Sequence, residues 1–203
     1  MPAPGKRTDV ASFDFTGHMA RLCDDVTMRH EAFQHIDMSR VAVCFAQARS
    51  RALHGLQAKL TPMRFEKGAL YTVRNGQRYT VQRVHLSGRE MLYLLTFYLP
   101  RFLQQSFKEK FVTVLHELYH ISAEFDGDIR RFGGRCHVHT HSQKEYDLQM
   151  ELYAREYLGM NPPRELYEFL TFDYSGLQKR YGSIMGLQVP IPKLIPVRDS
   201  RTA

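Results

Sequence analysis

The sequence has few cysteines and no long apolar run, and both absences narrow what the protein can be. Three cysteines among 203 residues are too few, and odd in number, for a framework of disulfides. No stretch of about 18 apolar residues is present that could span a membrane. The first residues, MPAPGKRTDVASFDF, include basic side chains but not the apolar segment of a secretory signal. We therefore expect a cytoplasmic protein that does not enter a membrane.

The basic residues are numerous but form no dense block. Lysine and arginine total 28 against 21 acidic residues, which gives a net charge of +7 and a pI near 9.4. Such an excess permits contact with nucleic acid or another polyanion. Scattered cations are equally typical of a solvated surface. The charge alone therefore leaves both interpretations open.

The domain organisation is simple. Residues 1–12 are rich in proline, glycine and charge, which is typical of a disordered segment. Residues 13–185 have the length and apolar patterning of one folded domain, without repeats or a linker. Residues 186–203 contain Pro190, Pro192 and Pro196 and are expected to form an extended tail.

Local patterns predict both helices and strands. Apolar residues at helical spacing predict helices over about 16–33 and 107–123, the second opened by a capping box of Ser106 and Glu109. A second Ser-x-x-Glu, at Ser142 and Glu145, predicts a helix that ends near Gly159, and RELYEFLTF predicts a short one. Branched and apolar runs predict strands over 40–47 and 90–98, and Asn75-Gly76 predicts a hairpin. The fold class that follows is α+β.

The motif HELYH lies within the predicted helix over 107–123. His116 and His120 are four residues apart, so both imidazoles leave one face of the helix and can bind a single zinc ion. Glu117, in the same turn, can reach a metal-bound water. Zinc lowers the pKa of such a water to about 7, and a carboxylate can take its proton as hydroxide attacks a carbonyl. The motif therefore predicts hydrolytic chemistry.

The residue that completes the coordination is less defined, because a catalytic zinc site needs a third protein ligand. The loop RCHVHTHS offers His137, His139 and His141, which share one side if the backbone is extended. Asp126 stands where some zinc peptidases place a third ligand after a glycine, although Ala123 occupies the glycine position here. Glu124 lies beyond comfortable reach of the metal and is better placed to cap the helix or to hold the second nitrogen of a histidine. Further candidates are Cys136 and the carboxylates of the following helix, namely Glu145, Asp147 and Glu151.

Three phrases of the sequence carry a resemblance to a known family. FQHIDMSRVAVCF, HELYHISAEFDGDIRRFGGR and the later SQKEYD resemble the phage metallopeptidases, small proteins of phages and bacteria, over about Phe33 to Leu158. The resemblance implies a small zincin-like domain, similar in outline to gluzincin-type and SprT-like peptidases, with a short antiparallel sheet packed on the HExxH helix. It carries over His116, Glu117 and His120, and a histidine after the RRFGGR turn that is best matched by His139.

We therefore expect a zinc-dependent metallopeptidase that cleaves a peptide or protein substrate. Its metal ligands would be His116, His120 and His139, and Glu117 would be the catalytic base. Two other hypotheses stay open. One is a nucleic-acid-associated protein, with a structural zinc or a protease activity exerted near DNA. The other is a different metal-dependent hydrolase, such as a nuclease.

Several neighbours of the motif have two interpretations each. The run MLYLLTFYL is either an edge strand that pairs with extended substrate or a buried core strand. Tyr119 and Tyr146 are either hydrogen-bond donors to a developing oxyanion or packing residues. Asp126 and Asp128 are either acceptors for histidine N–H groups or turn formers, and Arg130 and Arg131 either anchor that loop by ion pairs or face solvent.

Overall fold

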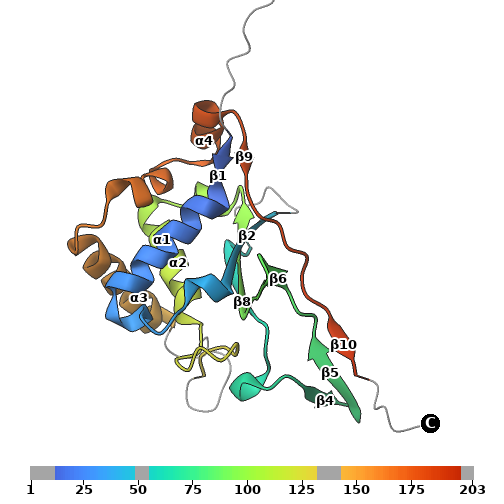
Figure 1. Ribbon diagram of the computed structural model, residues 1–203. Helices are drawn as coiled ribbons and strands as arrows, with labels where there is room; N and C mark the ends of the chain where they lie inside the picture. The colour runs from blue at the N-terminus through green and yellow to red at the C-terminus, as the bar shows by residue number, and fades with distance from the viewer. Residues whose placement is uncertain (1–11, 49–54, 132–142, 198–203) are drawn as a thin grey trace, which may run out of the picture.

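The computed structural model of the protein describes residues 12–48, 55–131 and 143–197, and it is an α+β structure (Figure 1). The α-helices are α1 (Phe15–Arg29), α2 (Phe107–Tyr119), α3 (Gln143–Gly159) and α4 (Tyr174–Tyr181). The 3-10 segments are η1 (Glu31–Phe33), η2 (Met38–Arg40), η3 (Glu66–Gly68), η4 (Phe102–Gln104), η5 (Arg164–Leu166) and η6 (Glu168–Thr171). In this part of the chain no helix combines the length and the hydropathy that a bilayer crossing requires.

A three-stranded sheet lies at the centre. Its strands are β2 (Val41–Gln47), β8 (Tyr93–Leu99) and β3 (Ala58–Pro62), in the order β2-β8-β3. β2 runs parallel to β8 and β3 runs antiparallel to it, so the sheet is mixed and the antiparallel sheet we expected is wrong. The parallel pair is possible because a long stretch of chain, containing β3, crosses over between β2 and β8.

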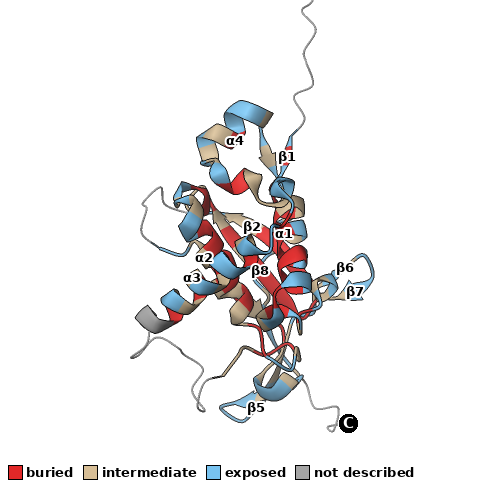
Figure 2. Ribbon diagram, turned by 90° about the vertical axis from the view of Figure 1, so that its left-hand side faces the viewer, coloured by how far each residue is buried: buried red, intermediate tan, exposed pale blue. Residues whose placement is uncertain are grey.

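The run MLYLLTFYL is the central strand β8, so its interpretation as an edge strand is wrong and that of a core strand is confirmed. Its alternate residues enter two different apolar clusters. Tyr93, Leu95 and Phe97 face the main core with α1 and α2, whereas Leu94 joins a smaller cluster on the opposite face. Apolar side chains on both faces are what a strand covered on both sides requires. Figure 2 shows this buried region in red at the centre.

Small peripheral sheets surround the central one. They comprise β1 (Phe13–Asp14) with β9 (Ile184–Met185), β6 (His85–Leu86) with β7 (Arg89–Glu90), and β10 (Leu194–Pro196) with β5 (Gln77–Val81) and β4 (Thr72–Arg74). The hairpin predicted at Asn75-Gly76 is confirmed. Both residues have positive φ, 50° and 76°, as the tight turn between β4 and β5 needs. The predicted tail is extended as far as it is described, and β10 within it pairs with β5.

Helix α2 begins as the sequence predicts. The Ser106 hydroxyl accepts from the Glu109 N–H, and the Glu109 carboxylate accepts from the Ser106 N–H, so the capping box is present. The helix buries Phe111, Val114, Leu115 and Leu118 in the main core. Ser142, the predicted cap of α3, lies outside the described residues, as does the side chain of Glu145.

Some predicted helix ends are wrong. Helix α1 ends at Arg29 and not near 33, because His30 takes an extended conformation and its ring then caps η1. Helix α2 ends at Tyr119 and not at 123, since the following chain turns back to form a bridge between Ile121 and Ile129. RELYEFLTF forms η5 and η6 because Tyr167, with φ −126°, interrupts the helical backbone between them.

Candidate metal centre

The last turn of α2 brings His116 and His120 together. Their ring centroids lie 4.6 Å apart, with the rings nearly perpendicular at 79°. His120 is the C-cap of the helix, yet it keeps helical φ and ψ, and its N–H donates to the His116 carbonyl. Both imidazoles therefore leave the same face of one helical turn, as the spacing of four residues predicts.

This arrangement fits a metal ion. Two imidazoles that bind one zinc ion at roughly 2.0–2.1 Å hold their ring centroids about 5 Å apart in a tetrahedral site. The observed 4.6 Å is close to that separation. Neither histidine residue is fully buried. Imidazole nitrogen is moreover a ligand that zinc prefers.

Tyr146, in the first turns of α3, covers one side of the histidine pair. Its ring centroid lies 4.7 Å from that of His116 and 6.0 Å from that of His120, against which it stacks. Burial raises the pKa of its hydroxyl, and the nearby Tyr119 and Glu117 add to that shift. The ring contacts support a packing role for Tyr146.

Helix α3 runs antiparallel to α2. Glu151, further along α3, forms an ion pair of 2.8 Å with Lys108, at the opposite end of α2 from the histidines. The start of α3 therefore lies beside the histidine pair, and Glu151 lies two helical turns or more away. Glu151 is accordingly unsuited to be the third ligand.

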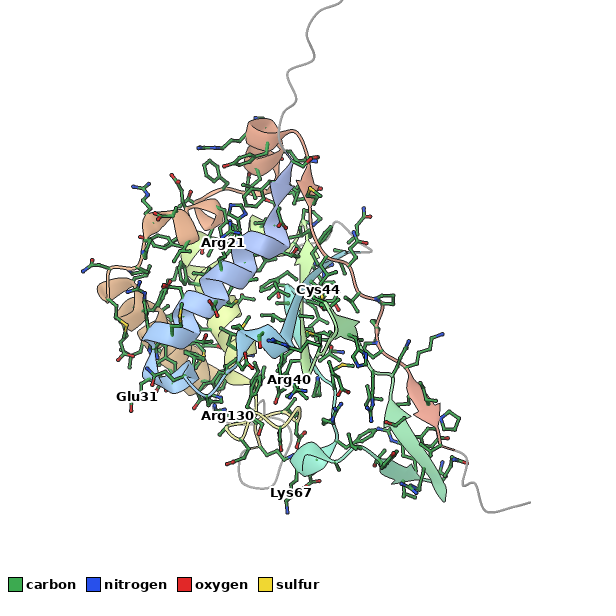
Figure 3. All side chains as sticks on the ribbon, in the orientation of Figure 1. Arg21, Glu31, Arg40, Cys44, Lys67 and Arg130 are labelled. Atoms are coloured by element: carbon green, nitrogen blue, oxygen red, sulfur yellow. The ribbon has the colours of Figure 1, made fainter. Side chains whose placement is uncertain are left out.

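The loop after α2 is folded against the end of the helix. The Arg130 N–H donates to the His120 carbonyl at 2.7 Å, and the Ser122 N–H donates to the Asp128 carbonyl at 3.2 Å. The hydroxyl of Tyr93, on β8, donates to the same Asp128 carbonyl and accepts from the Gly127 N–H, each at 2.9 Å. Figure 3 labels Arg130 in this loop. The histidine turn is thus tied to the central strand.

The acidic residues of this loop are turn formers. The Asp126 carboxylate accepts from the Asp128 N–H, and Asp128 in turn forms a 2.8 Å ion pair with Arg131. Asp128 is buried and also accepts from the Lys67 N–H of η3. The interpretation of Asp126 and Asp128 as turn formers is thereby supported, and of the two interpretations given to Arg131 the ion pair supports that of an anchor for the loop.

The third ligand predicted from the sequence, His139, lies outside the described residues, as do His137, His141 and Cys136. Within residues 12–48, 55–131 and 143–197, no cluster of three or more His, Cys, Asp or Glu is suited to a metal ion. The described residues on both sides of residues 132–142 lie next to the histidine pair. On the N-terminal side the Arg130 N–H donates to the His120 carbonyl, and on the C-terminal side Tyr146 packs against the rings of His116 and His120.

Glu117 points away from the loop, toward the edge of the central sheet. Its Oε2 accepts from the Leu60 N–H of β3 at 2.7 Å. Burial raises the pKa of this carboxyl to about 7, and the Leu60 N–H and Lys59 oppose that rise. A dication bound by the neighbouring histidines would lower the pKa again, because an opposite charge favours the carboxylate. No local pattern predicts this contact with β3, since Glu117 and Leu60 are 57 positions apart.

Tyr119 packs within the helical layer. Its ring contacts Phe33, Tyr146 and Tyr153, and the Arg130 guanidinium lies 4.2 Å from its centroid. Arg130 also donates from Nε to the Tyr119 carbonyl at 2.9 Å. These contacts support a packing role for Tyr119 and an anchoring role for Arg130.

No protein-family model, curated protein or solved structure matches this chain. The resemblance to the phage metallopeptidases therefore stays a prediction. The features that bear on function are the adjacent imidazoles of His116 and His120, the Glu117 carboxylate next to them in the chain, and the edge strand β3 that this carboxylate contacts.

Proposed function

We propose that the protein is a zinc-dependent metallopeptidase of the cytoplasm, with a small zincin-like domain. The observation that carries the proposal is the last turn of α2, where the rings of His116 and His120 lie 4.6 Å apart and Glu117 stands between them in sequence. His139 would be the third ligand, reached through the segment whose two flanks pack on the histidine pair.

A zinc ion held by these histidines would acidify a bound water and polarise a substrate carbonyl. Glu117 would hold the proton of that water on a carboxylate oxygen and deliver it to the departing amine. Its position supports this role, because Glu117 lies in the same helical turn as His116 and His120 and its carboxyl is half-buried. The internal glutamate of a helical HExxH favours carbonyl chemistry over phosphodiester chemistry.

The substrate would lie along β3, which is the edge strand beside α2. The Leu60 N–H points outward from the sheet, since it reaches Glu117, so Ala58, two residues earlier, also presents its backbone groups outward. An extended peptide can add to such an edge by main-chain hydrogen bonds. A peptide paired with Leu60 would compete for the N–H that Glu117 now accepts from, and would release the carboxylate toward the histidines.

The decisive experiment compares metal content and peptide hydrolysis in the wild type and Glu117→Gln. We expect both proteins to bind one zinc ion per chain, and the variant to be at least about 100-fold slower, as loss of a general base predicts. Glu165→Gln is the matched control, because Glu165 is an exposed carboxylate in η5 and is not part of the histidine turn. Full activity of Glu117→Gln would refute the proposed base. Cleavage of nucleic acid but not of peptides would favour a nuclease.

A further inference from the structure

The sheet of β10, β5 and β4 extends away from the body of the molecule (Figure 1). Both of its faces carry accessible side chains. By the register of the strands, Val73, Arg78 and Ile195 lie on one face, together with Tyr71 just before β4. Tyr71 is 43%, Val73 64% and Ile195 43% exposed. The opposite face holds Arg74 and Tyr79.

Positive charge is concentrated in this region. Residues 69–89 and 186–197 contain Arg74, Arg78, Arg83, Arg89 and Lys193, all of them exposed, and neither aspartate nor glutamate. These five residues account for most of the net charge of +7 of the chain. Glu90, directly after the first stretch, forms ion pairs with Arg64 at 2.8 Å and with Arg83 at 3.5 Å.

An aromatic ring and a guanidinium lie together on one face. The Arg78 Cζ is 4.5 Å from the centroid of the Tyr71 ring. Planar groups of this kind are surfaces on which unpaired bases stack, while flanking cations contact phosphates. A platform of this type recognises bases without needing a duplex groove.

We infer that the β4–β5–β10 sheet binds single-stranded nucleic acid, with Tyr71 stacking on a base and Arg78 and Lys193 contacting phosphates on the same face. Arg74, on the edge strand β4, contacts a further phosphate where the nucleic acid passes round the edge of the sheet. A second copy of this chain is the competing occupant of the exposed apolar side chains. The charge disfavours that occupant, because two such sheets placed face to face would bring their exposed cations together.

The test is fluorescence anisotropy with a labelled 20-nucleotide single strand, titrated with the full-length protein over a range of salt concentrations. Affinity should fall steeply with salt, with a log–log slope of roughly −2 for three phosphate contacts. Arg74→Glu/Arg78→Glu should weaken binding at least tenfold at 100 mM salt. Tyr71→Ala should weaken it severalfold and leave the salt slope unchanged, since a stacking contact releases no counterion.

The matched control is Arg21→Glu/Arg164→Glu. It changes the net charge by the same amount, and both arginines are exposed, on α1 and η5. Figure 3 labels Arg21 on the helical side of the molecule, away from the sheet. The control should bind within twofold of the wild type. An equal loss in the control would show that only overall charge matters and would overturn the assignment to this sheet.

Two further results would also overturn the inference. One is tighter binding of a duplex of the same length than of the single strand, and the other is dimerisation that Val73→Glu abolishes. Circular dichroism of each variant separates misfolding from lost contacts, and Arg74→Gln/Arg78→Gln provides a milder change with the same expected direction. Glu117→Gln should bind the oligonucleotide as the wild type does, so failure of the proposed peptidase activity leaves this test unaffected.

Discussion

At the residue scale, the pair of histidines follows from spacing alone. A separation of four residues on a helix places two side chains on one face, and this is what His116 and His120 do. The hydrogen bond between Glu117 and Leu60 could not be predicted from the sequence, because Leu60 belongs to a strand far away along the chain. Spacing alone also does not choose the third ligand among His137, His139 and His141, since these histidines occupy alternate positions in one short stretch.

The first prediction concerns that group. Substituting each of the three histidines by alanine in turn should show that only His139→Ala loses both zinc and peptidase activity. The reason is that a catalytic site needs one further protein ligand, while the other two imidazoles are then dispensable. Metal content after dialysis, measured by mass spectrometry, checks this. Loss of zinc in His137→Ala or His141→Ala, with His139→Ala intact, would reassign the ligand.

A buried lysine provides a second prediction. Lys110 is only 2% exposed, and its Nζ donates to the Leu170 carbonyl at 3.0 Å and to the Phe172 carbonyl at 2.6 Å. Burial lowers the pKa of this amine to about 8. Between that value and the ordinary pKa near 10.5, the unfolded chain binds more protons than the folded one, so the free energy of unfolding rises with pH.

Urea unfolding at pH 7.5 and pH 9 should therefore show a gain of about 1 kcal/mol from this residue at the higher pH. Lys110→Met should remove that gain. The contribution of Lys110 is then the difference between the two proteins in how much the free energy of unfolding changes from pH 7.5 to pH 9. Measurements above pH 9 are less suitable, because burial raises the pKa of the Cys23 thiol to about 12 and its titration acts in the opposite direction. An identical pH dependence in both proteins would contradict the prediction.

At the scale of elements, the sequence predicts the features that depend on neighbouring residues and not the pairing of distant strands. The capping box of α2 and the Asn75-Gly76 hairpin depend on neighbouring residues and were both predicted. β3, with the sequence AKLTP, was missed because it has little branched or aromatic character. The pairing of β1 with β9 also cannot be predicted from local sequence, since it joins residues more than 160 positions apart. Long-range pairing decides which strand is the edge, and this is why the sequence left both the edge and the core interpretation of β8 open.

The loop between α2 and residue 131 carries a prediction about Gly127. Its φ is +90°, and an added Cβ would lie 2.5 Å from the Arg64 Cγ and 3.0 Å from its Cβ. Gly127→Ala should therefore lower the free energy of unfolding by about 2 kcal/mol or more, through backbone strain and a clash. It should also weaken zinc binding, because the loop bonds to the His120 carbonyl.

Gly76→Ala is the matched control for this change. Gly76 also has a positive φ, of 76°, but no atom lies within 4 Å of an added Cβ. Gly76→Ala should lower the free energy of unfolding by only about 1 kcal/mol, and it should leave the zinc affinity unaltered. Thermal and urea unfolding compare the two variants. Equal costs would mean that the loop is not held as closely to Arg64 as described.

At the scale of the whole molecule, metal binding should couple to stability. His116 and His120 lie on a helix that buries four apolar residues in the main core, so a ligand bound there stabilises the folded state specifically. Zinc at about 100 times its dissociation constant should add roughly 2.7 kcal/mol to the free energy of unfolding. Calorimetry with and without a chelator checks this, with His116→Ala as the insensitive control. No shift in the wild type would argue against a bound metal.

The stretch from β9 to β10 has one more consequence. It supplies a strand to the sheet of β1 and another to the sheet of β5, and the Phe45 N–H donates to the Leu187 carbonyl between them. During synthesis, both sheets must wait for residues 184–196 to leave the ribosome. The nascent chain can already assemble its central strands and α2 by then. The sheet of β4, β5 and β10 would thus receive its third strand only after the central strands and α2 have been able to assemble.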